Sequence, residues 1–209
     1  MRYLPPILMV CAALLVSGCQ TGPATNDASK CGSDNCGQSP PAAKAPPAPD
    51  RLDELQTRLD QERDQAEQAQ QQVVQVMQKL PRGRRASAGE LRLADVNITD
   101  NQSGQTRAMH ALQSVSVTMP LAAKGRPEYT DAMDALKKLA NTLADARGSA
   151  QIEVDQSAAD VRARRVNTAT GVTQTSNGNP VSVRKHVDRA LPAGVERYTI
   201  QAGPLHDLP

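Results

Sequence analysis

Aromatic side chains are almost absent from this chain of 209 residues, which contains three tyrosines and neither phenylalanine nor tryptophan. A core must therefore be built from aliphatic side chains and methionine. Binding modes that stack bases or sugars on aromatic rings are disfavoured for the same reason. An excess of charge of one sign is also missing, because 24 basic and 22 acidic residues give a formal net charge of +2. We therefore expect no nucleic-acid partner.

The N-terminal apolar run, residues 3–16, follows a basic start and is too short to span a bilayer comfortably. This pattern is typical of a secretory signal peptide. The run ends in Val16-Ser17-Gly18-Cys19, which resembles the lipobox of bacterial lipoproteins. The resemblance implies a signal peptide over 1–18, cleavage before Cys19 and attachment of palmitate-type acyl chains to that residue. The alternative is an ordinary signal peptide with a cysteine there by chance.

Multiple acyl chains would make such an anchor effectively permanent. Residue 20 is Gln and not the Asp that commonly marks retention in the inner membrane in this class. The resemblance therefore implies the outer membrane, with the rest of the chain facing the periplasm. In that oxidising compartment Cys31 and Cys36 are candidates for a disulfide. Free or metal-binding thiols are the alternatives, although the sequence has no further ligands at zinc spacing, and we expect neither metal nor cofactor.

Residues 19–49 are rich in Gly, Ala, Ser, Asn and Pro and cannot bury enough apolar area to fold. We expect a disordered tether whose Pro-rich half is extended, at about 3.1 Å per residue. A Pro-rich docking ligand is the alternative.

An amphipathic helix is predicted over 50–80. Apolar residues recur there at alternating spacings of three and four, as in a coiled coil. The a positions of this heptad pattern are Leu52, Leu59, Ala66, Val73 and Leu80, and the d positions are Leu55, Glu62, Ala69 and Val76. Asp50 is a candidate N-cap, and Pro81 ends the pattern. The helix would either self-associate or pair with another envelope protein, or fold against the chain's own globular domain.

A basic linker over 81–89 precedes the predicted α+β domain, 90–209. Leu91, Leu93, Val96 and Ile98 suggest a strand with a shift of face, and residues 114–119 alternate strictly between apolar and polar. A helix is predicted over 129–147, with Thr130 as N-cap and Gly148 as C-cap. Strands at 152–154 and 195–200 and a second helix over 183–191 complete a small mixed sheet covered on one side by two helices.

The region from about 112 to 205 resembles the OmpA-type C-terminal domain of outer-membrane lipoproteins that hold peptidoglycan. The resemblance rests on the sequences Leu136-Lys137-Lys138-Leu139-Ala140, Ala150-Gln151-Ile152-Glu153-Val154-Asp155 and Val183-Arg184-Lys185. It implies an Asp and an Arg that grip the charged ends of diaminopimelate. Asp155 and Arg184 are the candidates, with Arg164 in reserve. The Gly-His-Thr-Asp-type segment of the family is absent, and 158–167 is an alternative position for the second helix.

Histidines are few, and none of the three stands near a nucleophile or an acidic pair in a catalytic arrangement. We therefore expect no enzyme and no catalytic residues. The sequence predicts a lipid-anchored envelope protein that links the outer membrane to peptidoglycan or to another envelope component. The alternative is an accessory lipoprotein of a trans-envelope machine, such as a pilus, secretion or conjugation apparatus, that binds proteins only.

Overall fold

The computed structural model describes residues 50–209. The expected signal peptide, Cys19, the Cys31–Cys36 pair and the 19–49 tether lie outside the described residues. Within residues 50–209, no helix is long and apolar enough to cross a membrane.

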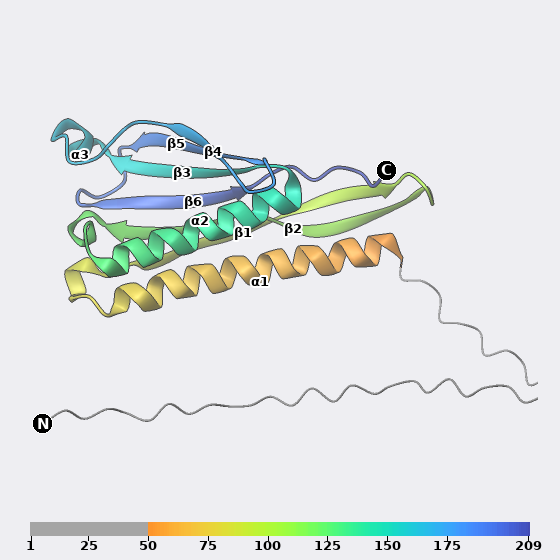
Figure 1. The fold of residues 1–209 in the computed structure, drawn as a ribbon, viewed down its shortest axis with the longest axis horizontal. Helices are drawn as coiled ribbons and strands as arrows, with labels where there is room; N and C mark the ends of the chain where they lie inside the picture. Colours follow the sequence, from red (N-terminus) through yellow and green to blue (C-terminus); the bar gives the residue numbers. More distant parts are fainter. Residues whose placement is uncertain (1–49) are drawn as a thin grey trace, which may run out of the picture. The chain divides into compact units, whose positions relative to one another are not determined.

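One mixed sheet of six strands organises the described part of the chain, in the order β1-β2-β6-β3-β5-β4. Its neighbouring strands are antiparallel except for β3 and β5, which are parallel. Two long helices lie on one face of the sheet (Figure 1). The predicted α+β class is therefore confirmed. The strands are β1 (Ser87–Asp100), β2 (Gln105–Pro120), β3 (Ala150–Ser157), β4 (Gly171–Gln174), β5 (Pro180–Asp188) and β6 (Val195–Ala202), and the helices are α1 (Arg51–Gln78), α2 (Pro127–Arg147) and the short α3 (Ala158–Arg162).

Strands β1 and β2 form a long hairpin. The alternation predicted over 114–119 is confirmed, since Val115 and Val117 face the core and pair with Ile200 and Tyr198 of β6. The shift of face predicted in β1 is also confirmed: the pairing register with β2 shifts between Arg92 and the next residue. Such an irregularity turns the following side chains to the other face of the strand.

Helix α1 packs against its own domain, which is the second of the two alternatives that the heptad pattern allowed. Its N-terminal half contacts the β1–β2 hairpin, and its C-terminal half lies in the same core as α2 and the sheet. Eight of the nine a and d positions are buried, and Val76 is half-buried. Self-association through these positions would therefore require the helix to leave the sheet. Small side chains at Ala66 and Ala69 leave room for the alanine-rich face of α2.

The polar d position of that pattern, Glu62, is explained by an ion pair with α2. Arg147 donates from Nε to Glu62 Oε2 at 2.7 Å, and its Nη1 donates to the Gly203 carbonyl at 3.3 Å. Both side chains are 3% exposed. The pair therefore joins the middle of α1 to the last turn of α2 inside the protein.

Helix α2 ends as predicted at Gly148, whose φ of 80° is the left-handed conformation that glycine adopts without strain. Its start differs from the prediction. The N-cap is Arg126, followed by Pro127 in the first turn, where the missing N–H of proline removes no hydrogen bond. Thr130 therefore lies inside the helix.

The helix predicted over 183–191 is wrong, because these residues mostly belong to β5, which pairs with β3 on one side and β4 on the other. The tight turn at Gly178, with φ of 83°, connects β4 to β5 as a hairpin. The alternative site for a second helix, 158–167, holds only the five-residue α3. The second of the two helices that cover this face of the sheet is α1.

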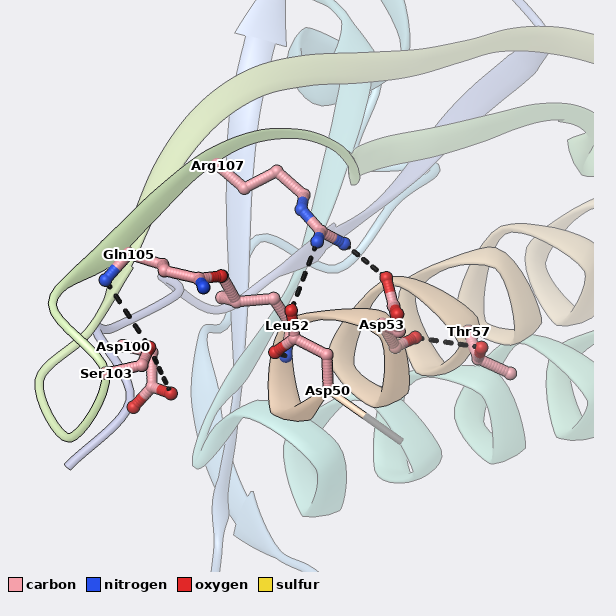
Figure 2. A network of polar contacts seen from close by, with 8 residues as sticks. All are labelled: Asp50, Leu52, Asp53, Thr57, Asp100, Ser103, Gln105 and Arg107. Carbon is pink, nitrogen blue, oxygen red and sulfur yellow. Dashed lines mark hydrogen bonds and ion pairs between the residues drawn. The ribbon is translucent and has the colours of Figure 1, made fainter. Parts of the chain in front are cut away.

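The start of α1 contacts the tip of the hairpin, as Figure 2 shows, and also the end of the chain. Asp50 caps the helix by accepting from Leu52 N at 3.1 Å, as expected. Arg107 of β2 bridges Asp50 and Asp53. Arg51 donates to Asp100 and to the carbonyl of Pro209, both at 2.9 Å.

Candidate functional site

The strands β3, β5 and β6 present chemically different side chains on their two faces, because successive residues of a strand point to opposite sides. Toward the helices they carry mainly aliphatic residues. On the other face, which no helix of the described residues covers, they carry a cluster of charged and polar side chains. This open face comprises Gln151, Glu153, Asp155, Ser182, Arg184, His186, Asp188, Arg197, Thr199 and Gln201.

Two of the three predicted ligand residues, Asp155 and Arg184, lie on this open face. Asp155 of β3 is opposite His186 of β5, and Arg184 is opposite Glu153, so the two are diagonal neighbours across the strand pair. The two positions lie on the same face of adjacent strands, and adjacent strands are about 4.8 Å apart in a sheet. Arg164 follows α3, is exposed and has a φ of 53°. The structure therefore brings Asp155 and Arg184 to one surface.

The partner of Asp155 is Arg197 of β6, which the sequence analysis did not single out. Arg197 Nη1 lies 3.6 Å from Asp155 Oδ2 and 3.5 Å from Asp188 Oδ2. The three side chains are between 23% and 41% exposed, so they remain accessible to a ligand. One guanidinium therefore bridges the carboxyl ends of two parallel strands. The sequence alone does not reveal this contact, because it depends on the pairing register between β3 and β6.

A second, weaker contact follows along the same strands. His186 Nε2 lies 3.9 Å from Glu153 Oε1, and Gln151 donates to the same carboxylate oxygen at 2.7 Å. Within residues 50–209 no three His, Cys, Asp or Glu side chains gather as metal ligands would. The open face therefore offers alternating carboxylates and guanidinium groups, an arrangement that can bind a ligand bearing both charges.

The opposite face of the same strands contains a cavity of about 420 Å³ beside α2. Its floor is aliphatic and is formed by Ile152 and Val154 of β3 and Val181 and Val183 of β5. Lysines line it from three separate segments, Lys124 before α2, Lys137 within α2 and Lys185 on β5.

One wall of the cavity is a buried polar cluster centred on Glu196, which is 2% exposed. Lys124 Nζ lies 2.8 Å from Glu196 Oε2, and Tyr198 donates to that oxygen at 2.7 Å. Gln156 donates to the other oxygen at 2.8 Å, and the Tyr129 hydroxyl is 2.8 Å from that of Tyr198. Both carboxylate oxygens therefore have partners.

These contacts and the burial of the cluster shift the pKa of the carboxyl group and the pKa values of the two tyrosines in opposite directions. Burial alone would raise the pKa of Glu196, but hydrogen bonds from Lys124, Tyr198 and Gln156 outweigh it, and the pKa is lowered. Burial, together with the neighbouring carboxylate, raises the pKa of Tyr198, and burial raises the pKa of Tyr129 to about 12. At neutral pH the cluster is thus an ionised carboxylate held by an ammonium group and neutral donors.

Comparison with family models, curated proteins and solved structures gives no match. The open face and the cavity lie on opposite sides of β3, β5 and β6, so each can be altered without touching the other.

Proposed function

We propose that this chain is a non-enzymatic lipoprotein of the outer membrane that faces the periplasm and binds peptidoglycan. The single observation that carries the proposal is the sequence Val16-Ser17-Gly18-Cys19, which resembles a lipobox and stands before a Pro-rich segment and a folded domain. Acylation of Cys19 would attach the chain to the membrane, and residues 19–49 would separate the membrane from the domain.

The open face supports the choice of ligand. The stem peptides of peptidoglycan contain diaminopimelate, whose free end carries an ammonium and a carboxylate group side by side. Asp155 suits the ammonium group, and Arg184 suits the carboxylate, because a planar guanidinium binds a carboxylate through two parallel hydrogen bonds. Arg184 has no carboxylate within ion-pair distance among the described residues, whereas Arg197 contacts both Asp155 and Asp188. Asp155 is 23% exposed despite its contact with Arg197, so its carboxylate remains accessible to an ammonium group. We further propose that the domain is a divergent OmpA-type domain in which this face holds the ligand.

Co-sedimentation with insoluble peptidoglycan tests the ligand. The full-length chain carrying Cys19→Ser avoids acylation and should sediment with the polymer. Asp155→Ala and Arg184→Ala should each reduce retention by about tenfold, as expected when one charged hydrogen-bonding partner is removed. Free diaminopimelate should compete. Arg92→Ala is the matched control, because Arg92 is 61% exposed on β1, separated from the open face by β2 in the strand order, and pairs with Glu90.

The anchor is tested separately by fractionating cells that express the full-length chain. Native protein should remain with the outer membrane, and intact mass should show acyl groups on Cys19. The Cys19→Ser chain should carry no acyl groups and should leave the outer-membrane fraction. An unmodified Cys19 in native material would overturn the proposed location.

Two open sheet edges favour a second candidate function, in which the chain binds only proteins of a trans-envelope machine. Strands β1 and β4 end the sheet and have no further strand beside them in residues 50–209. Val172 of β4 is 69% exposed and Leu93 of β1 is 43% exposed. An edge of this kind can accept a strand from a partner. Absence of retention on peptidoglycan in the native chain would favour this function.

A further inference from the structure

The cavity beside α2 has the features of a ligand site and is independent of the open face. Helix α2 crosses the sheet over β6 and β3 and leaves part of β5 uncovered, which creates a hollow of about 420 Å³. Water occupies about 30 Å³ per molecule in the liquid, so this space corresponds to about 14 water-sized groups. Small-molecule sites are usually hollows of this size with an apolar lining and a few placed polar groups.

The charges of the residues that line the cavity favour an anionic ligand. Lys124, Lys137 and Lys185 contribute three positive charges, and Glu196 is the one carboxylate among the described lining residues. Glu196 is already satisfied by Lys124, Tyr198 and Gln156, so it has no free oxygen for the other lysines.

The two remaining lysines are only partly engaged. Lys185 donates to the carbonyl of Asn167 at 2.6 Å, which leaves two of its three N–H groups. The Nζ of Lys137 lies 3.5 Å from Oδ1 of Asp134, which is on the same exposed surface of the helix. Both lysines line the cavity and keep unused donors, so they can bind an anionic group of a ligand in it.

We propose that this cavity binds a linear aliphatic carboxylate of about ten carbons. Its chain would lie on Ile152, Val154, Val181 and Val183, and its carboxylate would be held by Lys137 and Lys185. Decanoate has twelve heavy atoms and fits the estimated capacity. The site differs in position and in ligand from the face proposed to bind peptidoglycan, so either proposal can fail without the other.

Calorimetric titration of the full-length Cys19→Ser chain with hexanoate, octanoate and decanoate tests the proposal. Affinity should rise about fourfold for each added CH₂, the gain expected for a methylene moved from water into an apolar site. 1-Decanol, which lacks the charge, should bind more weakly than decanoate. Inorganic phosphate, which lacks the chain, should show no saturable binding. Equal affinity for phosphate and decanoate, or no saturable binding of decanoate, would overturn the proposal.

Substitutions then identify the site. Lys137→Gln and Lys185→Gln should each weaken decanoate binding by about fivefold, as for a partly exposed ion pair. Lys138→Gln is the matched control, because Lys138 is exposed on the same helix and does not line the cavity. Unchanged affinity in the Lys137→Gln/Lys185→Gln double variant would show that decanoate binds elsewhere and would refute the assignment. Asp155→Ala should leave decanoate affinity unchanged.

Discussion

The ion pair between Glu62 and Arg147 gives the sharpest test of how α1 is held. Both side chains are 3% exposed, and Arg147 donates to Glu62 Oε2 at 2.7 Å. Glu62 Oε1 has no hydrogen-bond partner in the structure, so the carboxylate is buried with half of its acceptors unused. An ion pair in this state should be costly to break and of little net benefit to keep.

The expected losses in the free energy of unfolding follow from the burial of both charged side chains. Glu62→Leu leaves a buried guanidinium, and Arg147→Met leaves a buried carboxylate. Each should lower the free energy of unfolding by about 3–5 kcal/mol. For a chain of this size each kcal/mol corresponds to about 2–4 °C in Tm, so each single variant should melt about 6–20 °C lower. The double variant should be as stable as the native chain or slightly more stable, because neither charge remains.

Thermal and urea denaturation of the four chains, followed by circular dichroism, measures this cycle. The sum of the two single losses should exceed the loss in the double variant by at least about 6 kcal/mol, which is twice the smallest single loss expected. The control is Arg63→Met with Asp60→Leu, an exposed pair on the same helix, which should change stability by less than about 1 kcal/mol. If the double loss equals the sum of the single losses, Arg147 does not determine the burial of Glu62, and the explanation given for this polar position fails.

Two further predictions concern other parts of the domain. Because the pKa of folded Glu196 is lowered, its stabilising effect is present above its ordinary value of 4.5 and is lost as the pH falls through the folded pKa. Glu196→Gln should therefore flatten the acid side of a stability–pH curve and cost about 1–3 kcal/mol at neutral pH; an unchanged acid limb would contradict this. Arg107→Ala should remove the link from β2 to Asp53 and accelerate amide hydrogen exchange in the first turns of α1, while exchange in α2 stays unchanged.

Several elements of the fold could be predicted because their local sequence pattern agrees with their tertiary environment. Residues 114–119 alternate in the sequence and form a strand with one face in the core. The apolar stripe of α2 and the stop at Gly148 coincide with the observed helix. The shift of face in β1 was visible because its apolar residues change parity between Leu93 and Val96.

The segment 180–191 was ambiguous because its apolar residues fit two periods. Val183, Val187 and Leu191 recur every four residues, as on a helix, whereas Val181 and Val183 alternate, as on a strand. Pairing with β3 and β4 decides in favour of the strand, and this pairing is a tertiary effect that no local spacing contains. The same reason hid Arg197, whose contact with Asp155 depends on a register between residues about forty positions apart.

The direction of α1 connects the proposed anchor to the proposed binding face. Residue 50 lies at the hairpin tip, where Arg51 also contacts the carbonyl of Pro209. The helix has 28 residues, so at 1.5 Å per residue it extends for about 42 Å along the sheet. Arg197 lies toward the other end, since it pairs with Thr118, close to the end of β2 opposite the hairpin tip, and Asp155 and Asp188 contact Arg197. Figure 1 shows this end of β2. The proposed membrane attachment before residue 50 and the proposed ligand on the open face would therefore act at opposite ends of the domain.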